Sequence, residues 1–382
     1  MKLFHLSDLH LGKRLCGVSL VEDQRDMLEK IIGHIKREKP DAVMIAGDVY
    51  DRSVPPEDAV ALFDSFLFEL SEMKVQVLII SGNHDSAERL AYGGRILNRS
   101  GIYISKEFNQ NNYDSILKPV ILSDEHGGIN FYLLPFVTPH TVKASRGCRP
   151  EAEISSYTDA LRTVIEEMNI DTSKRNVLIA HQFVTGASKC DSETFSVGGV
   201  DNVDASVFEP FDYVALGHLH GPQSIGGDTV RYCGTPLKYS FSETNHLKSI
   251  TVVDVGAKGT VNVSTTALDD PMHDLCVKKG SFDEVTAEGK SDDYIKVVLT
   301  DMNEGGDVLS KLRDHFKNIM QLSFELPQND IEYETDSIGN INELTPLQLF
   351  SNFYAIQTGS ELNERQIDIV KGIFDEIKGE NA

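Results

Sequence analysis

The first part of the chain alternates short apolar runs with amphipathic segments. Apolar runs at residues 3–6, 42–46 and 75–80 have the length of buried strands, and the segments between them carry apolar residues at helical spacing. Further apolar runs lie at residues 131–134, 177–180 and 213–216. This alternation predicts a layered α/β domain in which helices cover a sheet.

The pattern changes after the last of these runs. Residues 250–255 and 261–265, joined by a glycine-containing turn, predict a β-hairpin that closes the first domain. The strand-like run 294–299 and a helix around residues 309–316 then predict a small α+β unit. We therefore expect three parts, with limits at 1–270, 271–340 and 341–382.

The C-terminal segment is predicted to form two amphipathic helices. Residues 345–348, Thr-Pro-Leu-Gln, have the spacing of a capping box, with proline at the first helical position. Apolar side chains share a face of each helix: Leu347, Phe350, Phe353 and Tyr354 on the first, and Ile367, Val370 and Phe374 on the second. These faces either pack on the chain's own domain or bind a partner, and their place on a terminal extension favours a partner.

Five polar blocks directly follow predicted strands of the first part. They contain Asp8 and His10, then Asp48, then Asn83, His84 and Asp85, then His181, and finally His218 and His220. Open α/β sheets bind ligands at the carboxyl ends of their strands, so these side chains are expected to meet in one cleft. A single histidine or aspartate of this kind is usually structural, but the joint pattern favours a functional site.

The residue types suit a pair of divalent cations. Two such ions, about 3.5–4 Å apart, need a bridging carboxylate and several further ligands. Imidazole and carboxylate groups suit Mn²⁺, Fe²⁺ or Zn²⁺. Asp8 and His10 alternate on an extended segment and can face one ion, and Asn83 offers a carbonyl oxygen. The pattern therefore predicts a dinuclear metal phosphoesterase.

The blocks resemble those of the calcineurin-like metallophosphoesterase superfamily. The resemblance implies an α/β fold, a two-sheet sandwich flanked by helices, with a two-metal site. It assigns Asp8, His10, Asp48 and His220 to one ion, and Asp48, Asn83, His181 and His218 to the other. His84 then resembles the superfamily's catalytic histidine, which stabilises charge or protonates the leaving oxygen. For Asp85 two interpretations stay open: it orients His84, or it caps the loop.

Further stretches narrow the resemblance to the SbcD family of bacterial nucleases. They lie at residues 47–56, 232–243, 345–350 and 362–366. Archaeal and eukaryotic counterparts have a histidine where this chain has Asp51, and this difference favours the bacterial branch.

The narrower resemblance implies a Mn²⁺-dependent DNA nuclease subunit that acts in DNA repair, replication and recombination. Its activities would be an ATP-dependent exonuclease on double-strand ends and an endonuclease on single strands and hairpins. The small domain would be a capping domain that binds DNA, and the C-terminal helices would dock on an SbcC-type ATPase. A homodimer within a heterotetramer is expected.

The charge of the chain complicates this interpretation. With 36 Lys and Arg against 59 Asp and Glu, the formal net charge is -23, which argues against a simple basic nucleic-acid binder. Metal ions, a local basic strip or a partner would have to supply positive charge. The basic residues near the polar blocks either face DNA or are solvated surface charges: Lys13, Arg14, Arg89, Arg95 and Arg99.

The remaining composition predicts a cytoplasmic protein without a membrane partner. The 5 cysteines have no CxxC spacing, which favours free thiols in a reducing compartment. The N-terminal stretch, residues 1–8, is too short and too polar for a signal peptide. No apolar run reaches the ~20 residues of a membrane span.

Two other functions share part of the pattern. A phosphodiesterase or phosphatase with a small or protein substrate would use the same site without needing terminal docking helices. A non-catalytic scaffold would lack some of the ligands, and none of the expected ligands is missing from the sequence.

Overall fold

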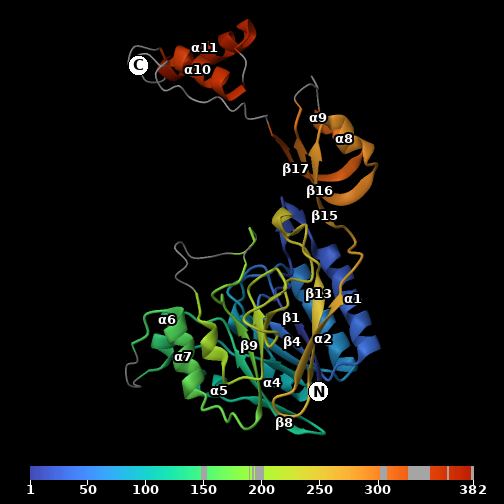
Figure 1. Ribbon diagram of the computed structural model, residues 1–382, viewed down its shortest axis with the longest axis vertical. Coiled ribbons are helices and arrows are strands. Elements are labelled where there is room, and N and C mark those ends of the chain that lie inside the picture. The colour runs from blue at the N-terminus through green and yellow to red at the C-terminus, as the bar shows by residue number, and fades with distance from the viewer. Residues whose placement is uncertain are drawn as a thin grey trace. The chain divides into compact units, whose positions relative to one another are not determined.

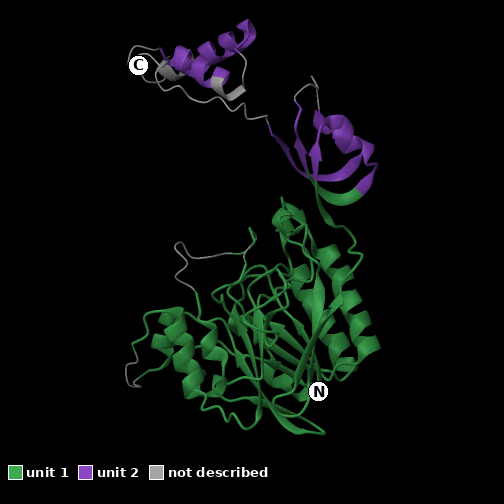
Figure 2. Ribbon diagram, viewed as in Figure 1, with its two compact units in different colours: residues 1–277, 292–296 green, residues 278–291, 297–382 purple. Residues whose placement is uncertain are grey.

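A computed structural model of the chain describes residues 1–147, 153–188, 190, 191, 193, 202–301, 308–325, 345–358 and 361–379. Two compact units are distinguished in Figure 2: Met1–Val277 with Asp292–Lys296, and Lys278–Ser291 with Val297–Ala382. The expected limits at residues 270 and 340 remain predictions, and the second of them lies outside the described residues.

The first unit contains two six-stranded mixed sheets. The first sheet has the order β14 (Val261–Ala267), β13 (Ser249–Val255), β1 (Lys2–Leu6), β4 (Ala42–Ala46), β5 (Gln76–Ile80), β6 (Ile102–Ile104). The second has the order β11 (Gln223–Ser224), β12 (Val230–Tyr232), β10 (Tyr213–Gly217), β9 (Arg175–His181), β8 (Gly127–Leu134), β7 (Val120–Asp124). The strands predicted from the apolar runs are confirmed.

Parallel pairing places the ends of the central strands together. Strands β1, β4, β5 and β6 are parallel, and so are β8, β9, β10 and β12. Antiparallel pairing of β13 with both β1 and β14 confirms the predicted hairpin and adds it to the edge of the first sheet.

Apolar side chains of both sheets form one core between them. Leu3, Met44 and Leu78 of the first sheet cluster with Phe131 and Ile179 of the second, and all five are fully buried. Residues from these strands therefore face inward in alternation, as a two-sheet sandwich requires. The predicted α/β sandwich is confirmed.

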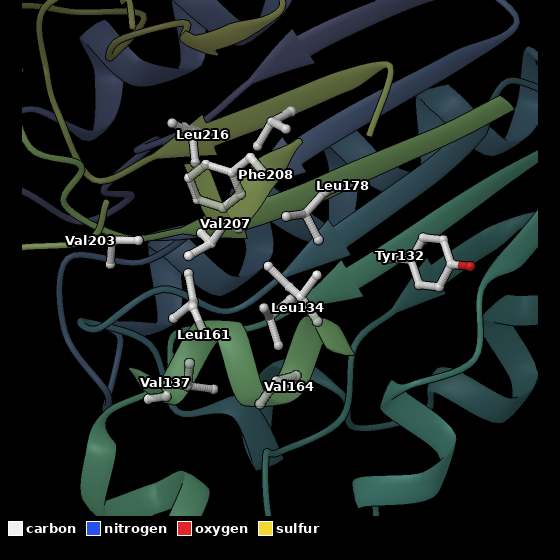
Figure 3. Packing of buried hydrophobic residues seen from close by; sticks show 14 of the residues in the cluster. Tyr132, Leu134, Val137, Leu161, Val164, Leu178, Val203, Val207, Phe208 and Leu216 are labelled. Carbon is white, nitrogen blue, oxygen red and sulfur yellow. The ribbon is translucent and has the colours of Figure 1, made fainter. Parts of the chain in front are cut away.

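Helices cover the outer faces of the sandwich. Figure 1 shows α1 (Val21–Glu38) and α2 (Glu57–Glu72) on one side, and α6 (Pro139–Ser145) and α7 (Tyr157–Glu167) on the other. Leu161 and Val164 of α7 point toward Leu178 and Leu216 of the second sheet (Figure 3). This spacing of three places both residues on the apolar stripe of the helix.

Short elements complete the first unit. They are β2 (Arg14–Leu15), β3 (Val18–Ser19), α3 (Ala87–Leu90), α4 (Gly94–Leu97), α5 (Tyr113–Ile116), and the 3₁₀ helices Asn98–Ser100, Ala205–Phe208 and Phe241–Glu243.

Most of a three-stranded sheet belongs to the second unit. Its order is β15 (Leu275–Gly280), β16 (Ser291–Leu299), β17 (Phe316–Phe324), and the helices α8 (Phe282–Ala287) and α9 (Val308–Arg313) accompany it. The predicted α+β content is confirmed, but the predicted helix around 309–316 is too long. Helix α9 ends at Arg313 because a turn follows it, and the fully buried Phe316 begins β17.

The C-terminal helices are α10 (Pro346–Thr358) and α11 (Glu364–Gly379). The predicted capping box is confirmed: the Thr345 backbone N–H donates to Gln348 Oε1 (2.8 Å), and the Gln348 N–H donates to Thr345 Oγ1 (3.3 Å). Throughout the described parts of the chain, no helix has both the length and the apolar character needed to cross a membrane.

Candidate metal centre

The loops that follow β1 and β4 are bound to each other through their backbones. The Asp8 N–H donates to Gly47 O (3.0 Å), and the His10 N–H donates to Asp48 O (2.9 Å). Asp8, His10 and Asp48 all have positive φ angles, between 43° and 53°, which non-glycine residues adopt at a conformational cost. These backbone bonds hold the three side chains at one edge of the sandwich.

Close packing around Asp48 explains a glycine in the next block. A Cβ atom at Gly82 would overlap the Asp48 carboxylate and its backbone nitrogen, so only glycine allows the loop after β5 to approach. The approach also brings the His84 N–H to Asp48 Oδ1 (2.9 Å).

Asp48 lies at the centre of the expected ligand set. Its Oδ2 atom lies 3.5 Å from His181 Nε2, 3.7 Å from His10 Nε2 and 4.0 Å from His84 Nε2. Asp48 is almost fully buried. A carboxylate in contact range of histidines on both sides has the position required of a bridging ligand.

Two groups of possible ligands surround this carboxylate. In one, a donor atom from each of Asp8, His10 and His220 lies within 4.8 Å of the others. In the other, Asn83 Oδ1 lies 2.9 Å from His181 Nε2 and 3.0 Å from His218 Nδ1. The structure thus brings together all seven residues expected as ligands.

His10 provides an independent indication that the site fits a cation. Its side chain is buried, and neither ring nitrogen has a hydrogen-bond partner within the described residues. Leaving a buried polar atom unsatisfied costs about 1–3 kcal/mol. A divalent cation held by the cluster would satisfy such a nitrogen, so the donors present fit the expected metals.

Burial and mutual charge shift the pKa values in the site. Burial raises the pKa of Asp8 to about 6 and lowers the pKa of His218 to about 3. Burial disfavours charged His181, but contacts with Asp48, Asp8 and the Ala46 carbonyl together outweigh burial and raise the pKa of His181 to about 9. The neighbouring histidines, His181 foremost, hold the pKa of Asp48 below its usual range despite burial. A cation would favour ionised carboxylates and neutral imidazoles, which are the ligand forms.

His84 lies beside the cluster and is more exposed than the six expected ligands that are buried. Its Nδ1 atom is 3.0 Å from Asp51 O, and its side chain is 24% exposed. A hydrogen bond from Nδ1–H to this carbonyl leaves Nε2 facing the site. A ring that is held in this way and is partly exposed to solvent can contact a substrate.

Asp85 does not contact the His84 ring through any described hydrogen bond. Its carboxylate accepts three backbone N–H groups, from Val49 (3.1 Å), Tyr50 (2.9 Å) and Gly82 (3.0 Å). It therefore ties the loops after β4 and β5 together. The loop-capping interpretation of Asp85 accounts for these contacts. The interpretation in which Asp85 acts as a catalytic residue beside His84 stays a prediction.

Asp51 lies in the loop after β4, beside Lys13 and His10. Its Oδ1 atom lies 2.8 Å from Lys13 Nζ and 3.6 Å from His10 Nδ1. Lys13 is thus paired with a carboxylate, while Arg89 donates to Ser53 O (3.1 Å).

Several supporting residues could not be identified from single positions in the sequence. Gln24 of α1 donates to His10 O (2.8 Å) and accepts from the Gly12 N–H (3.0 Å), so it fixes the first loop. Glu243 Oε1 lies 3.1 Å from His220 Nδ1, and the only sequence signal for Glu243 is its place in the stretch 232–243. The sequence contains these polar residues but does not reveal that they are buried and paired.

The two C-terminal helices pack on each other with part of their apolar surface. The Phe350 and Phe374 rings meet edge to face, with centroids 6.4 Å apart, and Gln366 donates to the Tyr354 hydroxyl (3.1 Å). The residues half-buried in α10 and α11 include Leu347, Tyr354, Ile367, Val370 and Phe374. Phe353 is 58% exposed. Ile369 (56%) and Ile373 (52%) are also more than half exposed, although the sequence pattern did not single them out.

The chain matches two family models in succession. The family described as Calcineurin-like phosphoesterase matches residues 1–222, and the Type 5 capsule protein repressor C-terminal domain matches residues 271–358. The first match covers the strands and loops that carry the whole cluster.

Two named relatives are similar to the chain over nearly its full length. The chain is 34% identical to the SbcD subunit of the SbcCD nuclease of Staphylococcus epidermidis, covering 98% of each chain. It is 32% identical to the SbcD subunit of the SbcCD nuclease of Staphylococcus saprophyticus, covering 100% of each. Similar solved structures include a dimetal phosphatase from Danio rerio, with a TM-score of 0.43, 13% identity and coverage of 71% of this chain and 97% of that one. Another is the calcineurin-like phosphoesterase YfkN from Bacillus subtilis, with a TM-score of 0.36, 15% identity and coverage of 70% and 90%.

The chain belongs to the calcineurin-like phosphoesterase family, and within it to the SbcD family of nuclease subunits. It is a metal-dependent phosphodiesterase.

Proposed function

We propose that the chain is the nuclease subunit of an SbcC–SbcD-type complex. It hydrolyses phosphodiester bonds with Mn²⁺, as an exonuclease at double-strand ends and an endonuclease on single strands and hairpins, under the control of an ATPase partner. The observation that carries the proposal is the cluster around Asp48, in a chain similar over its full length to nuclease subunits. Its work in DNA repair, replication and recombination would take place in the cytoplasm of a bacterial cell.

Seven side chains would hold the two metal ions. Asp8, His10 and His220 would bind one, Asn83, His181 and His218 the other, and Asp48 would bind both. When bound, a pair of Mn²⁺ ions would lower the pKa of a water ligand and neutralise phosphate charge.

His84 would act on the substrate rather than on the metals. Its Nδ1 is held by Asp51 O, and its Nε2 is left to contact a phosphate oxygen or the leaving oxygen. Its partial exposure supports this role, because a group that meets substrate must be reachable from the cleft.

DNA binding would depend on parts outside the metal cluster. The second unit would serve as a capping domain for DNA. Arg95 and Arg99 are exposed and remain candidates for backbone contacts, whereas Lys13 is paired with Asp51. Most of the affinity for DNA would come from the ATPase, because the chain itself is strongly acidic.

The α10–α11 pair would dock on the ATPase through its outward residues. Phe353, Ile369 and Ile373 are each more than half exposed, which supports an apolar interface there.

A homodimer would form through the first unit. Val60 (44%) and Phe68 (61%) lie on one face of α2, and nearby in sequence Tyr92 (88%) and Ile96 (75%) are also exposed.

The proposal is tested by hairpin cleavage with the full-length chain, the ATPase partner, ATP and Mn²⁺. The wild-type complex should cut the hairpin, and Asp48→Ala should reduce cleavage to background because both ions lose a ligand. Asp124→Asn, which alters a buried ion pair elsewhere in the first unit, should retain cleavage. Full cleavage by Asp48→Ala would contradict the proposal, as would hydrolysis confined to small phosphodiesters.

A further inference from the structure

A buried network contacts the Nδ1 side of His220. His220 Nδ1 lies 3.1 Å from Glu243 Oε1, and both side chains are buried. Glu243 is supplied by the 3₁₀ helix Phe241–Glu243, whose N-cap Ser240 accepts from the Ser242 N–H. A carboxylate therefore stands where it can accept a hydrogen bond from the imidazole of an expected ligand.

Lys248 fixes the carboxylate from its other side. Its Nζ donates to Glu243 Oε2 (2.6 Å), to Thr235 Oγ1 (2.6 Å) and to His220 O (3.0 Å). The side chains of Lys248 and Glu243 are 4% and 0% exposed. Three donor bonds from one ammonium satisfy the buried charge and leave Glu243 little freedom to turn away.

The arrangement determines which nitrogen of His220 is available. A neutral imidazole carries one N–H and one acceptor nitrogen, and the partner of the first nitrogen decides the tautomer. A carboxylate cannot donate, so it selects the Nδ1–H form and leaves Nε2 as the acceptor. His181 has a neutral acceptor at the same ring position, because its Nδ1 lies 2.8 Å from the Ala46 carbonyl oxygen.

We infer that Glu243 is a positioning residue for metal binding, which fixes His220 with Nε2 toward the cation, and that Lys248 holds Glu243 in place. The inference rests on the proposed ligand role of His220. Groups that orient ligands from behind typically change metal affinity about 10–100-fold when they are removed.

The test measures metal binding directly on the full-length, metal-stripped chain. Free Mn²⁺ is followed by electron paramagnetic resonance during a titration. The main variant, Glu243→Leu with Lys248→Met, replaces the buried ion pair by apolar residues of similar size, a change that folded proteins often tolerate. His220 O keeps the Thr235 N–H as a partner in this variant. Glu243→Gln retains an acceptor atom without the charge.

The wild type should bind two Mn²⁺ ions per chain. One of the two should bind about 10–100-fold more weakly in the double variant, with Glu243→Gln intermediate. Proton–nitrogen NMR of histidine-labelled protein that carries diamagnetic Zn²⁺ should show His220 protonated at Nδ1 in the wild type and a loss of this defined tautomer in the double variant.

Asp124→Asn is the matched control. It removes a buried carboxylate that binds Arg175 (2.6 Å) at the first residue of β9, whereas His181 is the last residue of that strand. This variant should lose stability but keep wild-type Mn²⁺ affinity.

The outcomes separate the inference from the proposed function. Unchanged Mn²⁺ affinity and tautomer in the double variant would overturn the inference alone. Equal weakening in Asp124→Asn would also overturn it, because the effect would then follow stability. A wild-type chain that binds no Mn²⁺ would overturn the proposed metal centre as well.

Discussion

At the scale of single residues, His84 separates catalysis from metal binding. Its ring is held by Asp51 O and is partly exposed, while six of the seven expected ligands are buried. We expect His84→Gln to bind Mn²⁺ as the wild type does but to cleave DNA about 10²–10⁴-fold more slowly, the range typical for loss of a general acid or charge-stabilising group. Mn²⁺ titration and single-turnover cleavage measure the two effects. Loss of one Mn²⁺ ion would instead make His84 a ligand.

The Asp85 carboxylate predicts a pH-dependent stability. Burial raises its pKa to about 6, above the ordinary value of 3.8, so protonation favours the folded state. This contribution is fully present below about pH 4 and is lost as pH rises through about 6, and a shift of this size corresponds to about 3 kcal/mol. With a chelator present, the free energy of unfolding of the wild type, relative to that of Asp85→Asn, should therefore fall by up to about 3 kcal/mol as the pH rises through that range. Urea unfolding measures it, and a pH-independent difference would contradict the shift.

At the scale of elements, buried strands were predictable because they lie between a sheet and a helix layer and are apolar throughout. All five residues of β4 are buried, and the run 42–46 matches its limits. The helix predicted around 309–316 was too long because Phe316 continues a helical spacing from Leu312, although a turn intervenes. Local spacing alone cannot register that turn, which is fixed by backbone bonds.

The exposed apolar residues of the C-terminal helices are expected to contact the ATPase. Phe353→Glu with Ile369→Glu should weaken ATPase binding at least about tenfold, because charges would replace apolar side chains at the centre of the proposed interface. Ile121→Glu alters an equally exposed apolar residue on β7 and should leave binding unchanged. Isothermal titration with the ATPase measures both. Equal affinity in the double variant would move the docking surface elsewhere.

At the scale of the whole molecule, the grouping of the expected ligands was predictable, but the residues packed behind them were not. Asp8, Asp48 and His220 follow strands whose ends lie at one edge of the sandwich. The alternation of strands and helices in the sequence predicts such parallel strands, so this grouping could be foreseen. The pairing of Glu243 with His220, or of Gln24 with the His10 loop, depends on how distant loops fold onto each other. A single sequence contains the residues of such pairs but does not show which of them contact each other.

The charge of the whole chain sets its expected behaviour with DNA. A formal net charge of -23 repels a polyanion, so the chain alone should bind a short duplex with a Kd of about 10⁻⁴ M or weaker at physiological salt. The complex with the ATPase should bind at least about tenfold tighter, with a steeper loss of affinity as salt rises, because added phosphate contacts release more counterions. Fluorescence anisotropy over a salt series measures both. If the chain alone bound as tightly as the complex, a local basic strip would have to act, and Arg95→Ala with Arg99→Ala should then abolish that binding.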